Sequence, residues 1–301
     1  GRGDRIGIIA ETSADFLAAF FACQYAGFVP VPLPLSINFG GKDAYVERLR
    51  GMLKAAGARA AMAGPELIGI LREAAIGTEV RLTATATELQ SRPTSDSPLE
   101  PLGAGDVCYI QYSSGSTSFP RGVLVTQAAL AANARSIAVD GLALRPGDRC
   151  TSWLPLYHDM GLVGCCLTPV MTQISVDYLS TTAFARRPLV WLELISRYRG
   201  TISFGPTFGY ELCARRAANG AARDLDLRTW RVAGIGGEMI RPQALAAFAD
   251  TFEASGFDAR AFVPSYGMAE ATLAVTFNPI GRGVRVDRVA KGDTFERQHL
   301  A

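Results

Sequence analysis

Short apolar runs alternate with amphipathic segments along almost the whole chain, and this alternation limits the folds that it can adopt. In the first cycle, we expect a strand at Arg5–Ala10 and a helix from about Ala14 to Ala26, with Ser13 as its N-cap and Gly27 at its end. The next run, Phe28–Leu35, carries three prolines, so it suits an edge or extended segment. Strands separated by helices form mainly parallel sheets with helices on their faces. The sequence therefore predicts an α/β fold.

The cycle then repeats to near the end of the chain. Further strands are expected at Arg59–Ala63, near Val80, and at Val107–Tyr112, Arg149–Trp153, Ile174–Leu179, Thr201–Phe204, Trp230–Ile235 and Arg260–Val263. Further helices are expected near Asp43–Ala56, after Pro65, from Thr126 to about Val139, and near Gly161–Met171, Pro188–Tyr198, Phe208–Ala218 and Pro242–Ala254. Residues 90–105 are rich in Pro, Ser and Gly and indicate a connection. We therefore expect two α/β parts, at about 1–105 and 106–277, with ligands beyond the carboxyl ends of strands.

Composition excludes several classes of protein. The chain has 301 residues, of which 49% are hydrophobic, and its 30 basic and 28 acidic residues are spread evenly, so we expect no nucleic-acid partner. No apolar run is long enough to span a membrane. Six cysteines without a CxxC pair argue against a zinc or disulfide framework and favour a cytoplasmic location. Because the chain starts without Met and leads straight into a strand, we expect it to be an internal piece of a longer protein.

The segment Tyr109–Val125, YIQYSSGSTSFPRGVLV, contains a run of Ser, Gly and Thr from Ser113 to Ser118. Hydroxyl groups, a glycine that lets the backbone approach a ligand, and the cation Arg121 together suit a loop around phosphate at a strand end. The run lacks the ending of a Walker A loop. Taken alone, it is equally consistent with a mobile Ser/Gly linker.

Three later strand ends also carry unusual residues. The segments are WLPLYHDMGL (Trp153–Leu162), VAGIGGEMIR (Val232–Arg241) and VPSYGMAEAT (Val263–Thr272). Individually, each has an ordinary structural interpretation: a core histidine, a strand-to-helix turn of two glycines, and a strand end with an isolated Tyr and Glu. The second segment does not complete the G-x-G-x-x-G pattern of dinucleotide sites.

In this order and at these intervals, the four segments resemble the motifs of the adenylate-forming superfamily, and most closely those of the fatty acyl-AMP ligases. Trp230 and the segment Pro206–Arg216, PTFGYELCARR, are also similar to that branch, and residues 278–301 loosely resemble the start of its characteristic insertion. The resemblance implies the large N-terminal domain of such an enzyme, with two mainly parallel sheets and helices between and around them in αβαβα layers. It also implies truncation, because the ribose-binding segment, the hinge and the small C-terminal domain with its catalytic Lys come later in the family than anything in this chain.

The resemblance also assigns roles to residues around one bound ATP. The β- and γ-phosphates would be held by Ser113, Ser114, Gly115, Ser116 and Thr117, with Arg121 nearby. The adenine and the α-phosphate would be bound by Gly236, Gly237, Glu238, Ser265, Tyr266, Gly267, Met268 and Ala269. Glu270 would coordinate Mg²⁺, and His158 would lie beside the carboxylate of the substrate, with Phe204, Gly205 and Tyr210 as walls of an acyl channel. Arg121 stands where many relatives have Lys. An arginine keeps the positive charge of lysine, but its planar guanidinium has a different shape.

The implied reaction is the attack of a fatty carboxylate on the α-phosphorus of ATP, which gives acyl-AMP and pyrophosphate. Positioning and charge stabilisation suffice, and the carboxylate needs no general base because it is already ionised at neutral pH. The implied acceptor is an acyl carrier protein, or a carrier domain of a polyketide or non-ribosomal peptide synthase. An acyl-CoA synthetase, an amino-acid-activating domain and a catalytically silent nucleotide-binding or acyl-binding module remain alternatives. All of the binding roles require that the four loops converge around one nucleotide.

Overall fold

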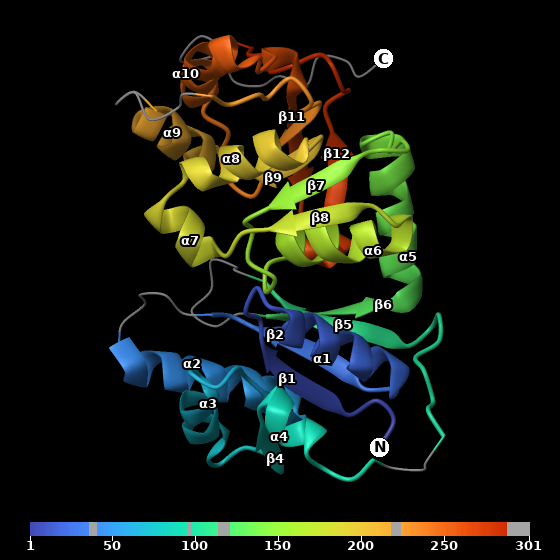
Figure 1. Cartoon of the computed structure of the whole chain (residues 1–301). Helices are drawn as coiled ribbons and strands as arrows, with labels where there is room; N and C mark the ends of the chain where they lie inside the picture. The colour runs from blue at the N-terminus through green and yellow to red at the C-terminus, as the bar shows by residue number, and fades with distance from the viewer. Residues whose placement is uncertain (36–40, 95–97, 114–120, 218–223, 288–301) are drawn as a thin grey trace, which may run out of the picture.

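The computed structural model describes residues 1–35, 41–94, 98–113, 121–217 and 224–287 (Figure 1). Its first sheet has parallel strands in the order β2-β1-β3-β4. These strands are β1 (Arg5–Ile9), β2 (Val29–Leu33), β3 (Ala58–Met62) and β4 (Leu82–Ala84), and the accompanying helices are α1 (Ala14–Tyr25), α2 (Gly41–Ala56), α3 (Ile68–Ala75) and α4 (Ala86–Gln90). The N-cap predicted for the first helix is confirmed, because the Ser13 Oγ accepts a hydrogen bond from the Phe16 N–H at 3.2 Å.

Strand β2 forms one edge of this sheet, as its prolines predicted. The Val29 N–H donates to the Asp4 carbonyl at 2.9 Å, and the Leu33 carbonyl accepts from the Ala10 N–H at 3.0 Å. Backbone groups of alternate residues point to opposite sides of a strand, so Pro30 and Pro32 stand where N–H groups would face away from β1. Strand β5 (Val107–Tyr112) lies beside β2 but belongs to a different sheet.

The second sheet has six strands in the order β12-β11-β10-β9-β7-β8. Strand β12 is antiparallel to β11, and the other pairs are parallel. The strands are β7 (Arg149–Ser152), β8 (Ser175–Tyr178), β9 (Ile202–Gly205), β10 (Val232–Ile235), β11 (Phe262–Gly267) and β12 (Ala274–Phe277). The helices in this part are α5 (Gln127–Ser136), α6 (Thr168–Thr172), α7 (Thr181–Arg186), α8 (Leu189–Tyr198), α9 (Thr207–Arg216) and α10 (Pro242–Phe252), with π-helical segments η1 (Ile137–Gly141) and η2 (Met160–Leu167) and short 3-10 turns η4 (Glu253–Ser255), η5 (Ala259–Ala261) and η6 (Ala269–Ala271). The predicted α/β fold is confirmed.

An antiparallel hairpin of β5 and β6 (Gly122–Thr126) lies between the two larger sheets (Figure 1). Ile110 and Tyr112 pack into the core of the first sheet, whereas Tyr109 packs into a second cluster together with residues of α1 and η2. The Tyr112 hydroxyl donates to the Met52 carbonyl of α2 at 2.6 Å, and burial raises the pKa of this phenol to about 12, so it remains a donor at neutral pH. The hairpin therefore connects the two cores.

Apart from the short 3-10 turns, four elements were not predicted from the sequence: β6, β12, α4 and α7. Each is four to six residues long, too short for a periodic pattern, and β6 and β12 adjoin segments that are interpreted as binding motifs. The helix expected near Gly161–Met171 is present, but it is formed by η2 followed by α6. Within the described residues, no helix has both the length and the apolar character needed to cross a membrane.

The core of the second sheet is rich in aromatic residues, and two of them have paired polar atoms, whereas the buried Trp153 Nε1 has no hydrogen-bond partner among the described residues. The Trp191 Nε1–H donates to the Ser203 Oγ at 2.8 Å, and the Tyr210 hydroxyl donates to the Gly234 carbonyl at 2.9 Å. Burial of the Trp191 and Tyr210 rings therefore leaves neither of their donors without an acceptor.

All six cysteines are free thiols and are buried.

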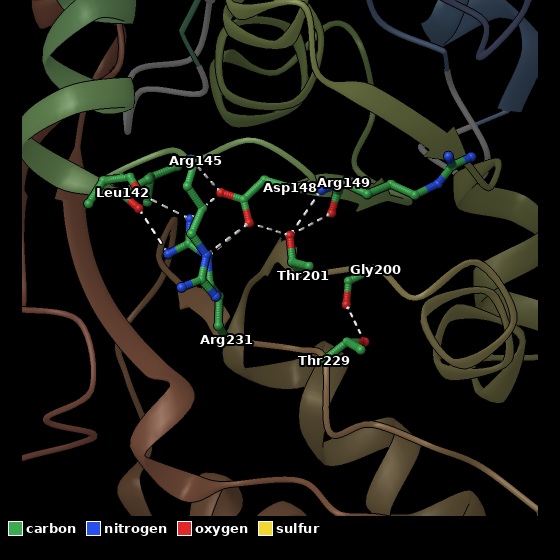
Figure 2. Close-up of polar contacts among 9 residues, drawn as sticks. Leu142, Arg145, Asp148, Arg149, Gly200, Thr201, Thr229 and Arg231 are labelled. Carbon is green, nitrogen blue, oxygen red and sulfur yellow. Dashed lines mark hydrogen bonds and ion pairs between the residues drawn. The ribbon is translucent and has the colours of Figure 1, made fainter.

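A buried ion pair fixes the amino ends of three parallel strands (Figure 2). Asp148 precedes β7, and its carboxylate accepts from the Arg231 Nε at 2.9 Å, from the Thr201 hydroxyl at 2.8 Å and from the Arg145 N–H at 2.9 Å. The Arg231 Nη1 also donates to the Leu142 carbonyl just after η1, at 3.1 Å. Burial acts to raise the pKa of Asp148, but the hydrogen bonds from these partners outweigh it and hold the pKa below the usual 3.8.

We expect Asp148→Asn to lower the free energy of unfolding by about 3 kcal/mol, because Arg231, with a side chain that is only 15% exposed, would lose its charge partner. Urea unfolding followed by circular dichroism measures this change. The folded-state pKa of Asp148 is lowered, so its stabilisation is present above pH 3.8 and is lost as the pH falls below that value. The difference between the two proteins should shrink over that range.

Glu193→Gln is the matched control, since its carboxylate lies 4.0 Å from Arg187 at the exposed surface. This change should alter stability by less than about 1 kcal/mol. Equal losses for the two variants would show that burial of the Asp148 pair does not matter.

Candidate active site

One cavity, of about 350 Å³, opens where the carboxyl ends of β9, β10 and β11 face the end of β5 and the turn before η2. The implied binding roles require four loops to converge, and described residues of all four line this cavity. The candidate residues on its wall are Ser113, His158, Phe204, Gly236, Gly237, Ser265, Tyr266, Gly267, Met268, Ala269 and Glu270. Ser114, Gly115, Ser116 and Thr117 lie outside the described residues. The cavity thus lies where parallel α/β sheets generally bind ligands.

The glycine turn after β10 leaves bare backbone on the cavity wall. Gly237 has a φ of +79°, which favours glycine at this position. A Cβ atom on Gly236 would lie 3.1 Å from the Ser265 carbonyl oxygen, so the neighbouring strand end leaves little room for a side chain. Met160 is the side chain closest to Gly237. A flat group can therefore approach the backbone here.

The end of β11 presents an aromatic ring and a carboxylate to the same cavity. The Tyr266 side chain is 61% exposed, and Glu270 is exposed on the short turn η6. Strand β12 returns antiparallel to β11, and the Met268 N–H donates to the Leu273 carbonyl at 2.8 Å, which closes the loop between the strands. The ring and the carboxylate are thus held by one closed loop.

His158 lies in a tight turn between β7 and η2. Its N–H donates to the Pro155 carbonyl at 3.1 Å, and its own carbonyl accepts from the Leu162 N–H at 2.8 Å. The imidazole Nδ1 accepts a hydrogen bond from the Met160 N–H at 3.3 Å and lies 2.7 Å from the Asp159 Oδ1. The Nδ1 side of the ring is therefore occupied, and Nε2 is left for other partners. Asp159 also accepts from the Met160 N–H at 2.7 Å, which makes it the N-cap of η2.

Several cavity residues were not identified from the sequence. An apolar wall is formed by residues of η1, the segment after it, and the β11–β12 hairpin: Ile137, Leu142, Leu273, Ala274 and Phe277. The first sheet and α2 contribute Pro32, Pro34, Arg48 and Met52. These residues come from helices and strands without a motif, so only the fold brings them to the site. Gln111 also lines the cavity, and a signal for it existed, because it is a polar residue within an apolar strand.

Three candidate residues do not line the cavity. Tyr210 is fully buried, hydrogen-bonded to the Gly234 carbonyl and packed among core aromatic rings, so it is not a cavity wall. Gly205 faces Trp153 and Trp191 instead of the cavity. Glu238 accepts a hydrogen bond from the Phe208 N–H at 2.8 Å, which turns its carboxylate to the start of α9.

Arg121 is exposed, and its carbonyl accepts from the Ser113 N–H at 2.9 Å. It directly follows the part of the hydroxyl loop that the structure does not describe. Its contact with phosphate therefore remains a prediction.

The acidic groups at the cavity suit a metal ion that is coordinated partly by the protein and partly by a bound ligand. Among the described residues, no group of three or more His, Cys, Asp or Glu side chains could hold a metal by itself. Mg²⁺ at nucleotide sites is commonly held by one or two carboxylates together with phosphate oxygens and water. The Glu270 carboxylate, which has no partner among the described residues, fits this arrangement.

The comparisons with known proteins agree on a family. The family described as AMP-binding enzyme matches residues 1–292. A proposed acyl-CoA synthetase of Caulobacter vibrioides is 46% identical over 99% of this chain and 52% of its own length. The medium-chain fatty acid–acyl carrier protein ligase JamA of Moorena producens is 34% identical over 99% of this chain and 51% of its own length. This chain therefore spans about half the length of these relatives.

A solved structure from a study of fatty acyl-adenylate ligases of E. coli and L. pneumophila has a TM-score of 0.91 and 49% identity to this chain. The match covers 95% of this chain and 51% of that one. The fold described above is therefore found in a solved relative of high identity.

The space at Gly161 yields a prediction. A Cβ atom there would overlap the Pro155 carbonyl oxygen, a backbone atom that cannot move without displacing the turn that holds His158. We expect Gly161→Ala to lower the free energy of unfolding by about 1–3 kcal/mol, measured by urea unfolding.

Gly164 is the matched control in the same π-helical segment. A Cβ atom at Gly164 would meet only the flexible end of Leu273, at 3.2 Å. Gly164→Ala should therefore cost less stability than Gly161→Ala, and the reverse order would contradict the packing described here.

Proposed function

The chain belongs to the AMP-binding enzyme family, and from that premise we propose that it activates a fatty acid with ATP to give acyl-AMP and pyrophosphate. The observation that supports this most is the shared cavity, where Ser113, His158, Gly236 and Glu270 come together although they are far apart in sequence. The wall is polar at these residues and apolar at η1 and β12, which suits a substrate with a charged head and an apolar chain.

The adenine is proposed to lie against the bare backbone of Gly236 and Gly237, with the exposed Tyr266 ring stacked on it. Ser265, Gly267, Met268 and Ala269 would surround the base and the α-phosphate, since they line the same cavity. Ser113 begins the loop whose hydroxyls, Ser114 to Thr117, are proposed to bind the β- and γ-phosphates. These groups stabilise spread negative charge without covalent chemistry.

His158 is proposed to hold the fatty carboxylate in line with the α-phosphorus. Asp159 and the Met160 N–H occupy its Nδ1 side, so the Nε2 side is the one available to the substrate. The acyl chain would continue between Phe204, Ile137, Leu142 and Phe277, which replace Gly205 and Tyr210 as the proposed apolar wall. Holding the two reactants at attack distance supplies much of the acceleration in a reaction of this kind.

Glu270 is proposed as the protein ligand of Mg²⁺, with phosphate oxygens and water completing the coordination. When bound, the metal would neutralise negative charge on the phosphates. The chain's own contribution is to hold one carboxylate at a defined place, on the turn η6 beside Tyr266.

The acceptor of the acyl group is proposed to be a carrier protein. Similarity to a fatty acid–acyl carrier protein ligase over 99% of the chain and to the fatty acyl-adenylate ligase structure supports this acceptor, whereas the Caulobacter relative keeps an acyl-CoA synthetase as the second candidate. An amino-acid-activating domain is disfavoured, because Asp159, the one acidic residue suited to an α-amine, is 12% exposed and already engaged by His158 and the Met160 N–H.

The acceptor can be tested with the full-length protein, ATP, Mg²⁺ and a C12 fatty acid, offering either CoA or a phosphopantetheinylated carrier protein. We expect acyl-AMP to form and the carrier to be acylated, with no acyl-CoA, as measured by mass spectrometry. Formation of acyl-CoA would favour the synthetase, and absence of acyl-AMP would favour a catalytically silent module.

The metal role predicts that Glu270→Gln lowers the rate of acyl-AMP formation by about 100-fold or more, a loss typical of removing a group that stabilises transition-state charge. Stability should be unchanged, because the Glu270 side chain is exposed and has no partner among the described residues. Radioactive pyrophosphate exchange and thermal melting measure the two properties.

Glu253→Gln, at an exposed position on η4 outside the cavity, is the control and should leave the exchange rate within about twofold of the wild type. A Glu270→Gln protein that is as active as this control would remove Glu270 from the metal site.

A further inference from the structure

Gln111 occupies an unusual position for a polar side chain. It lies near the end of β5, is 1% exposed and lines the cavity. Its Nε2 donates to the Tyr157 carbonyl at 2.6 Å, across 46 residues of sequence. Its Oε1 is buried and has no hydrogen-bond partner among the described residues. The amide orientation follows from this bond, because only the nitrogen can donate to a carbonyl.

An unpaired buried oxygen is costly, so the amide needs a compensating contact. Packing does not require a glutamine here, because an apolar side chain of similar size would fill the same space without an unsatisfied atom. The contacts that an apolar residue could not make are the hydrogen bonds of the amide nitrogen, to the Tyr157 carbonyl at 2.6 Å and to the neighbouring Tyr112 carbonyl at 3.4 Å. The bond to Tyr157 is the shorter one and reaches another part of the chain, so it is the feature that distinguishes glutamine at position 111.

The bond acts on the peptide group that immediately precedes His158. The carbonyl of this group is held by Gln111, and its N–H, which belongs to His158, is held by the Pro155 carbonyl at 3.1 Å. Because a peptide group is planar, fixing both of its polar atoms fixes the orientation of the plane and with it the position of the His158 Cα, from which the side chain extends. Two residues after Gln111, Ser113 begins the hydroxyl loop, so the same strand sets the position of both.

We propose that Gln111 is a positioning residue, which holds His158 in register with Ser113 through its hydrogen bond to Tyr157. Its role in catalysis rests on the proposed function of the cavity, whereas its effect on the His158 ring does not. Loss of the bond should act on the fatty carboxylate more than on ATP, because the adenine wall at Gly236 and Tyr266 is built from other strands.

The kinetic test compares Gln111→Leu with Gln24→Leu in the full-length protein. Gln24 is a matched control, since its Nε2 also donates to a carbonyl of β5, that of Cys108, at 2.6 Å, but it does not line the cavity. We expect Gln111→Leu to lower kcat for acyl-AMP formation at least about tenfold, with the KM for ATP within about twofold, because small misplacements of reacting groups are costly. Gln24→Leu should retain the wild-type kcat. Equal kcat values for the two variants would overturn the proposal.

A spectroscopic test is independent of any activity. In the full-length protein, the imidazole NMR signals of His158 can be assigned by comparison with a His158→Gln variant. Gln111→Leu should shift the His158 signals, and Gln24→Leu should leave them in place. Unshifted His158 signals would overturn the proposal even if the enzyme is active, and shifted signals would support it even if wild-type protein makes no acyl-AMP.

Gln111→Glu serves as the conservative variant, because it keeps the shape of the side chain. An ionised carboxylate cannot donate to the Tyr157 carbonyl, but a protonated carboxyl group can. Its activity relative to wild type should therefore rise as the pH falls. A constant ratio across pH would count against the hydrogen bond as the cause.

Discussion

Both faces of strand β5 are buried against a hydrophobic core, and most of the structure depends on this constraint. Its side chains at 110 and 112 complete the core of the first sheet, whereas Tyr109 enters the cluster shared by α1 and η2. The Tyr112 hydroxyl further fastens the strand to α2. A shift of one residue would exchange the two faces and bury the wrong side chains in both cores. The register of β5 is therefore fixed, and with it the place where the hydroxyl loop begins.

On the opposite wall of the cavity, close packing of glycine backbone against neighbouring atoms determines how the strand ends lie, more than hydrogen bonds do. A Cβ atom on Gly234 would overlap the Phe204 ring, and one on Gly267 would overlap the Leu273 carbonyl oxygen. Glycine at these positions lets β9, β10, β11 and the returning β12 approach closely enough for their ends to form one surface. The Asp148 network holds the other end of the same strands, where Arg231 and Thr201 meet its carboxylate. Both ends of the second sheet are thus constrained.

Much of this arrangement could be predicted from the sequence, for identifiable reasons. Long segments with helical or strand periodicity, such as α1 and β5, and the residues that cap or end them gave the α/β fold. Motifs at strand ends gave Ser113, His158, Gly236 and Glu270, because the carboxyl ends of parallel strands meet at one edge. Contacts between distant segments could not be foreseen. The same tyrosine at position 210 suits a channel wall or a core, and only the neighbouring Trp191 and the Gly234 carbonyl decide. Likewise, Ile137 and Phe277 have no motif, and their place on the cavity wall follows from packing alone.

The prolines of β2 have a consequence for where the first sheet ends. Because Pro30 and Pro32 remove the donors from the outer side of this strand, its edge cannot continue into a regular ladder of hydrogen bonds. Strand β5 lies along this edge but pairs with β6 instead. The boundary between the first sheet and the hairpin is thus written into the covalent structure of two residues.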